Sequence, residues 1–93
     1  NAGLSTNERR AATVLYKALS AAGSMETDNA DQVRRRMRAV IEEEPLADLD
    51  YVSVANPQTL DELDTVTESA LALVAVRIGK TRLIDNMAIG SKA

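Results

Sequence analysis

The spacing of apolar residues changes from a helical to a strand period near the middle of this 93-residue chain, which limits the folds open to it. Before Pro45, apolar side chains recur at every third or fourth position, as they do along one face of an α-helix. From Asp50 to Ala55 the period is two, as in a strand with one drier face, and an apolar strand follows from Ala70. A helical block followed by a strand block predicts an α+β domain in which helices pack on one sheet.

The first helix is predicted to begin at about Thr6, because the residues from Ser5 to Glu8 have the form of a capping box. Gly23 is expected to end this helix in the left-handed conformation. The positions expected to be buried follow the helical period, and they are Ala11, Val14, Leu15, Ala18, Leu19 and Ala22.

A polar link from Ser24 to Asn29 precedes the second predicted helix, whose end is marked by Pro45. Its expected buried positions are Ala30, Val33, Met37, Val40 and Ile41.

The strand block predicts a three-stranded antiparallel sheet with strands from Asp50 to Ala55, from Ala70 to Ile78 and from Thr81 to about Ile89. Gly79-Lys80 permits a tight reversal between the last two strands, and Val74 stands where a P-loop would need glycine. The middle strand is apolar on both faces, so it is expected to be central.

Two helices cover only one face of so small a sheet. We therefore expect Leu60, Leu63 and Val66, in the connection between residues 56 and 69, to cover the second face. A sheet covered in this way leaves no large apolar patch, which predicts a mostly monomeric domain.

Four arginines, Arg34, Arg35, Arg36 and Arg38, form the only dense basic cluster of the sequence. Three glutamates follow them, so a solvated helix face is favoured over contact with phosphates or with another domain. Within this helix the spacing predicts two ion pairs, Asp31–Arg35 and Arg38–Glu42.

Composition excludes several kinds of site. The chain has no histidine and no cysteine, so it lacks the commonest general base and cannot form disulfides or thiolate metal sites. With a net charge of -3, no metal-ligand spacing and no long apolar run, we expect no metal, no nucleic-acid partner and no membrane partner. A cytoplasmic location follows as the expectation.

The last predicted strand carries the string Arg82-Leu83-Ile84-Asp85-Asn86. Burying its polar members would cost several kcal/mol unless each has a partner. Arg82 and Asn86 are therefore expected to hydrogen-bond backbone groups elsewhere in the domain and Asp85 to meet a cation. Two other roles remain open, which are positioning of the segment that begins at Asn1 and direct contact with a ligand.

Several of these segments recur together in one family. The chain opens with N-x-x-L-S-x-x-E-R from Asn1, continues through Asp50-Tyr51-Val52 and the turn Pro57-Gln58-Thr59-Leu60, and closes on an apolar strand, Gly79 and R-L-I-D-N. This order and spacing resemble the C-terminal domain of the pantothenate synthetases, the pantoate–β-alanine ligases. The resemblance implies that residues 1–93 form the lid domain, with the N-terminal nucleotide-binding domain absent.

The resemblance also implies a reaction. Enzymes of this family use ATP and Mg²⁺ to make pantoyl adenylate, which β-alanine then attacks. Their catalytic H-x-G-H motif belongs to the other domain, so no catalytic residue and no bound cofactor are expected in this chain, and alone it is expected to be inactive. Asn1 would end the segment that contacts ATP phosphates, and Arg82, Asp85 and Asn86 would support that segment. The alternative is a free-standing protein-interaction module without catalysis.

Overall fold

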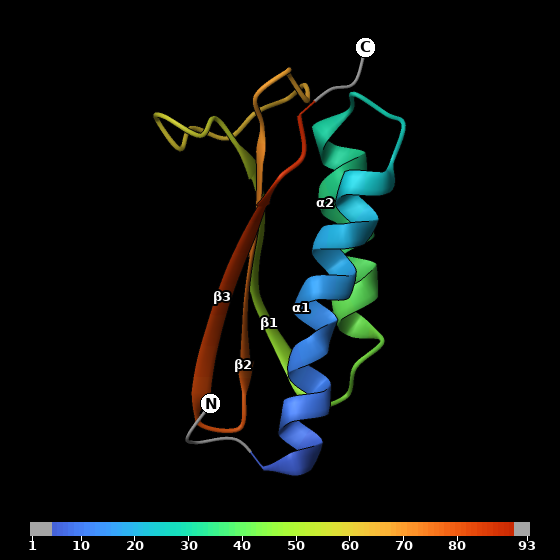
Figure 1. Ribbon diagram of the computed structural model, residues 1–93, viewed down its shortest axis with the longest axis vertical. Helices are drawn as coiled ribbons and strands as arrows, with labels where there is room; N and C mark the ends of the chain where they lie inside the picture. Colours follow the sequence, from blue (N-terminus) through green and yellow to red (C-terminus); the bar gives the residue numbers. More distant parts are fainter. Residues whose placement is uncertain (1–4, 91–93) are drawn as a thin grey trace.

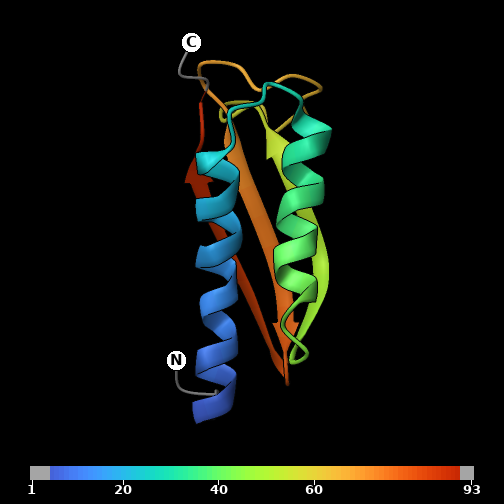
Figure 2. The ribbon, with the colours of Figure 1, turned by 90° about the vertical axis from the view of Figure 1, so that its right-hand side faces the viewer.

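The computed structural model describes residues 5–90 of the chain. Two antiparallel helices lie side by side over one face of a three-stranded antiparallel sheet, which confirms the predicted α+β fold (Figures 1 and 2). The elements are α1 (Thr6–Ser24), α2 (Ala30–Glu42), β1 (Ala47–Ala55), β2 (Leu71–Ile78) and β3 (Thr81–Ala88). None of the helices within residues 5–90 is long and apolar enough to cross a membrane.

Helix α1 begins with the predicted capping box. The Ser5 hydroxyl accepts a hydrogen bond from the Glu8 N–H at 3.2 Å, and the Ser5 N–H donates to the Glu8 carboxylate at 2.9 Å. All six positions predicted to be buried are buried. The predicted left-handed cap at Gly23 is wrong. The helix continues through Gly23, and Met25 caps it in an extended conformation while its N–H donates to the Ala22 carbonyl.

Helix α2 begins at the Asn29 cap, whose side-chain oxygen accepts from the Gln32 N–H at 3.1 Å. Its five predicted buried positions are confirmed. The helix ends at Glu42, three residues before Pro45, since proline disfavours the helical conformation in the residue before it.

The strands are ordered β1-β2-β3, so the doubly apolar β2 is central as predicted. Strand β1 begins at Ala47, earlier than the predicted Asp50, and its register with β2 shifts between Leu49 and Tyr51. Gly79 and Lys80 alone connect β2 to β3, and Gly79 has a φ of 60°. Such a two-residue turn requires this left-handed conformation, which glycine adopts without steric cost.

The core lies between the helix layer and the sheet. Alternate residues of β2 face the helices and are fully buried. Among residues 5–90 the largest fully buried side chains are Leu19, Met37, Ile41, Ile78, Val33, Val54, Val74 and Val76. Each such side chain contributes about 1.5–3 kcal/mol of stability on removal from water. One layer of helices therefore buries the apolar side chains on this face of β2.

The opposite face of the sheet is largely uncovered, so the prediction that the connection from residue 56 to 69 covers it is wrong. Leu60 is 60% exposed, while Leu63 and Val66 join the core on the helix side. The connection follows the free edge of β1, where the Leu63 N–H donates to the Val54 carbonyl at 2.9 Å. In Figure 1 it lies at the upper end of the sheet.

We call the uncovered surface the open face. The register of the three strands assigns it Asp48, Tyr51, Ser53 and Ala55 from β1, Leu71, Leu73, Ala75 and Arg77 from β2, and Arg82, Ile84, Asn86 and Ala88 from β3.

Candidate functional site: the open face and its arginine

The middle of the open face is apolar and accessible. Tyr51, Ala75 and Ile84 form one row across the three strands, and Tyr51 and Ile84 are 36% and 53% exposed. Ala75 between them is fully buried. Its single methyl group is covered by its neighbours, so the accessible apolar surface of this row comes from Tyr51 and Ile84.

Arg82 reaches across the sheet next to this row. Its Nε donates to the Asp50 carboxylate at 2.7 Å, and its guanidinium carbon lies 6.0 Å from the centre of the Tyr51 ring. Arg82 belongs to β3 and Asp50 to β1, so the pair spans two strand spacings of about 4.8 Å each. The small Ala75 side chain leaves room for this crossing.

A backbone irregularity aims Asp50 at this arginine. Leu49 pairs with Val76 and Tyr51 pairs with Ala75, which leaves Asp50 as the extra residue of a bulge. Bulges redirect a side chain and increase the local twist. Both side chains of the pair are close to 40% exposed. Solvent screening holds such a pair to about 0.2–1 kcal/mol, so its main effect is to fix the orientation of the guanidinium.

The side chains from Arg82 to Asn86 alternate between the two faces of β3, and the polar ones are not buried. Arg82 and Asn86 are exposed on the open face, and Asp85 is exposed on the helix side of β3, which is an edge strand. Arg82 binds a carboxylate where backbone was expected. Asp85 accepts from the Asn86 N–H at 2.8 Å where a cation was expected, and it forms no ion pair with residues 5–90. Asn1 lies outside the described residues.

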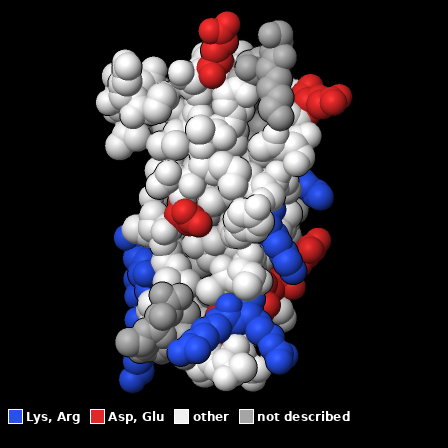
Figure 3. Space-filling model, viewed as in Figure 1, with Lys and Arg blue, Asp and Glu red and all other residues white. Residues whose placement is uncertain are grey.

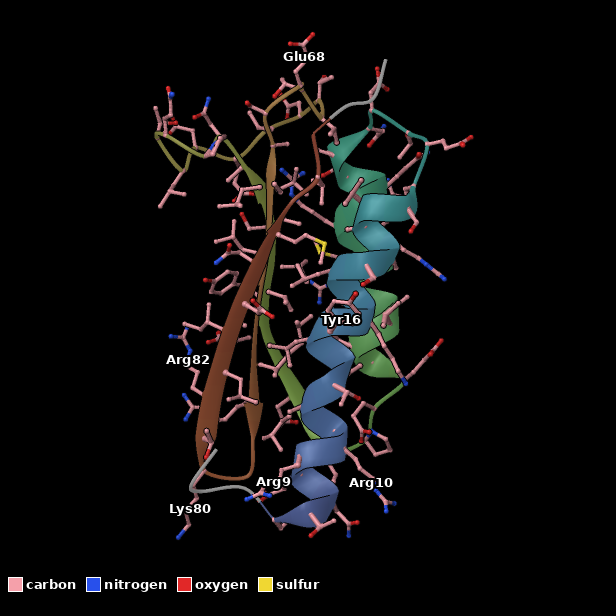
Figure 4. All side chains as sticks on the ribbon, viewed as in Figure 1. Arg9, Arg10, Tyr16, Glu68, Lys80 and Arg82 are labelled. Atoms are coloured by element: carbon pink, nitrogen blue, oxygen red, sulfur yellow. The ribbon has the colours of Figure 1, made fainter. Side chains whose placement is uncertain are left out.

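Basic side chains gather toward the end of the domain where α1 begins and β2 turns into β3 (Figure 3). These two segments are adjacent, since a Cβ atom on Gly79 would clash with the Glu8 carboxylate. In Figure 4, Arg9 and Lys80 lie at this end, with Arg82 above Lys80 on the sheet. Within residues 5–90, neither Arg9 nor Lys80 has an ion pair. Residues 5–90 also contain no group of three acidic side chains that could hold a metal ion.

Arg34 departs from the solvated arginine cluster that the sequence predicts, since its side chain is only 18% exposed. It pairs with Asp31 at 2.8 Å and with Glu62 at 3.0 Å, so the predicted Asp31–Arg35 pair is wrong by one position. Its Nη2 donates to the Val54 carbonyl at 3.1 Å and to the Leu63 carbonyl.

The remaining arginines of the cluster, Arg35, Arg36 and Arg38, are exposed, and the predicted Arg38–Glu42 pair is not among the ion pairs of the described part of the chain. Arg34 differs because it lies one turn after the buried Ala30 and one turn before the buried Met37. That spacing places Arg34 toward the core side of α2, a signal that the sequence contains.

The fold is that of a small two-layer α+β domain, and it recurs in solved enzymes. Two crystal structures of pantothenate synthetase from Thermus thermophilus match it with TM-scores of 0.86 and 0.89, each at 30% sequence identity. They cover 94% and 97% of this chain, which corresponds to 32% and 33% of theirs.

The sequence model of the family Pantoate-beta-alanine ligase matches residues 1–88, and the chain belongs to this family. It is 58% identical over 92 residues to the pantothenate synthetase of Roseiflexus sp. (strain RS-1) and 49% identical over 90 residues to that of Dehalococcoides mccartyi (strain ATCC BAA-2266 / KCTC 15142 / 195). These matches cover 92% and 94% of the chain but 32% and 34% of the relatives. The chain thus spans about a third of their length.

Proposed function

We propose that this chain is the C-terminal lid domain of an ATP-dependent ligase that condenses pantoate with β-alanine through a pantoyl-adenylate intermediate. The observation that carries the proposal is the open face of the sheet, on a chain that spans about a third of the length of its relatives. The remainder of such a synthetase is the surface that this face would meet.

The open face combines apolar and polar residues, as expected of a surface that is exposed to solvent in one state and buried in another. Its apolar middle contains Tyr51, Leu73 and Ile84, and its rim contains Arg77 and Asn86. Interfaces between domains of one chain are more polar than permanent ones, so this mixture suits a contact that forms on closure and releases on opening. The helix side, by contrast, packs its apolar stripe fully against the sheet.

Closure serves the chemistry of an acyl adenylate. Water would hydrolyse this intermediate, and a lid that covers the site excludes water while the amine attacks. ATP and Mg²⁺ would be held mainly by the rest of the synthetase, with Asn1 at the end of the segment that contacts the ATP phosphates. This chain contributes no catalytic acid or base, and it is inactive alone. The alternative is a free-standing interaction module, which would act without the rest of a synthetase.

Two measurements test the proposal. The isolated chain should give no ATP–pyrophosphate exchange above a blank in the presence of pantoate and Mg²⁺, and turnover there would contradict the lid role. In the longer synthetase polypeptide, Tyr51→Asp should lower kcat/KM at least about tenfold, which is a loss of about 1.4 kcal/mol. Tyr16→Asp is the matched control, since Tyr16 is 65% exposed on α1 and should leave activity unchanged. Equal activity in both variants would remove the open face from the mechanism.

A further inference from the structure

The guanidinium of Arg82 is oriented by its neighbours, but most of its N–H groups have no acceptor among residues 5–90. Arginine has five N–H donors, and within residues 5–90 the only hydrogen bond of this side chain is the one from Nε to Asp50. The four N–H groups of Nη1 and Nη2 therefore have no acceptor among the described residues. An arginine fixed by a carboxylate and an aromatic ring loses little conformational entropy when it binds a further group.

Two more cations stand beside it. Arg77 is directly opposite Arg82 in the β2–β3 register and on the same face, and Lys80 occupies the turn that joins these strands. Like charges directly opposite each other destabilise a sheet. Neither Arg77 nor Lys80 has an ion pair among residues 5–90. This end of the face therefore carries an arrangement that an anion would stabilise.

The carboxylates nearby do not cancel this arrangement. Asp48 and Asp50 both belong to β1, whereas the three cations belong to β2, the turn and β3. Asp48 is directly opposite Arg77 in the β1–β2 register, and Asp50 accepts from the Nε of Arg82 at 2.7 Å, so each carboxylate lies beside one of the cations. Three cations and two carboxylates at this end leave one net positive charge, and the Nη groups of Arg82 have no acceptor among residues 5–90.

We propose that Arg77, Lys80 and Arg82 form a binding site for a phosphate-chain anion at the turn end of the open face. The planar fork of Arg82 suits two oxygens of one phosphate group, and Lys80 supplies a mobile point charge for a neighbouring phosphate. The phosphate chain can belong to a nucleoside triphosphate or to free pyrophosphate, which share this chemistry. The inference deepens the proposed function and rests on it for this choice of ligand. Asp50 and Tyr51 are positioning residues in this site.

The site can be tested on the 93-residue chain itself by ¹⁵N NMR titration with tripolyphosphate. Saturable shifts are expected at Tyr51, Arg77, Lys80 and Arg82, together with the Nε resonance of Arg82. Arg82→Lys keeps the charge but loses the fork, so affinity should fall about tenfold, as expected for the loss of one charge-assisted hydrogen bond. Arg35→Gln is the matched control, an exposed arginine of α2 whose loss should change affinity less than about twofold.

Further arms identify the source of the phosphate chain. Binding of ATP but not pyrophosphate assigns a nucleotide, the reverse assigns pyrophosphate, and either supports the site. The site is refuted if citrate binds as tightly as tripolyphosphate, or if Arg82→Lys binds tripolyphosphate with wild-type affinity. It is also refuted if Arg82→Gln and Arg35→Gln lower the affinity for tripolyphosphate equally. Amide spectra of each variant report whether it is folded. The proposed function fails independently, if the longer polypeptide lacks ligase activity while tripolyphosphate still binds this chain.

Discussion

Replacing Arg34 by alanine should destabilise the domain far more than any other substitution in the arginine cluster of α2. Arg34 alone in that cluster joins three parts of the fold, since it contacts Asp31 of its own helix, the Val54 carbonyl of β1, and Glu62 and the Leu63 carbonyl in the connection. Removal of its guanidinium leaves the edge of β1 and the connection without this link.

The magnitude follows from which groups lose a partner. The Val54 carbonyl keeps the hydrogen bond from the Leu63 N–H, whereas Arg34 is the donor to the Leu63 carbonyl. A hydrogen bond to a charged group contributes about 1.5–3 kcal/mol. The Asp31 and Glu62 carboxylates are 72% and 57% exposed and regain water, so their pairs add at most about 1 kcal/mol. Together these terms predict a loss of about 2–4 kcal/mol.

Urea unfolding followed by far-ultraviolet circular dichroism at fixed pH measures this loss directly. Arg34→Ala should also lower Tm by at least about 8 °C. Arg35→Ala is the matched control and should stay within about 0.5 kcal/mol of the wild type, because Arg35 is exposed. If Arg34→Ala unfolds at the same urea concentration as Arg35→Ala, the contacts of Arg34 do not stabilise the domain and the reasoning is wrong.

Four further substitutions test other parts of the fold, each by urea unfolding. Gly79→Ala should lower the free energy of unfolding by about 1–2 kcal/mol because Gly79 has a positive φ. The new methyl group should also displace Glu8, so Glu8→Ala should lower this free energy less in the Gly79→Ala variant than in the wild type, and strict additivity would argue against the contact. Arg82→Ala should cost at most about 1 kcal/mol, and a loss above about 3 kcal/mol would show that the Asp50 pair is not screened as its exposure implies. Leu60→Gly should be neutral or stabilising by up to about 1 kcal/mol, because Leu60 is exposed with a φ of 63°, and clear destabilisation would contradict strain there.

The elements of the fold could be predicted from local patterns. The capping box at Ser5, the helical period of the apolar residues and the glycine turn at Gly79 each act over a few residues, and each is found as predicted. The doubly apolar β2 also indicated the order of the strands. These signals depend on backbone hydrogen bonding and side-chain periodicity, which the sequence carries locally.

The surfaces between the elements were harder to predict. The sequence does not specify whether Leu63 and Val66 pack on one face of the sheet or the other, because either placement buries them. The partner of Arg82 depends on a bulge at Asp50, which shifts the register by one residue and has no clear signature in this sequence. The sequence singled out Arg82, but it gave no sign that this side chain binds Asp50 on an open face.

The most direct test of the lid proposal compares the two tyrosines of the chain. Tyr51 lies on the open face, and Tyr16 is exposed on the outer side of α1. In the longer synthetase polypeptide, hydroxyl-radical labelling read by mass spectrometry reports the solvent exposure of both side chains. When ATP, Mg²⁺ and pantoate are added, labelling of Tyr51 should fall severalfold and labelling of Tyr16 should not change. If Tyr51 stays as accessible as it is without substrates, the open face is not the surface that closes.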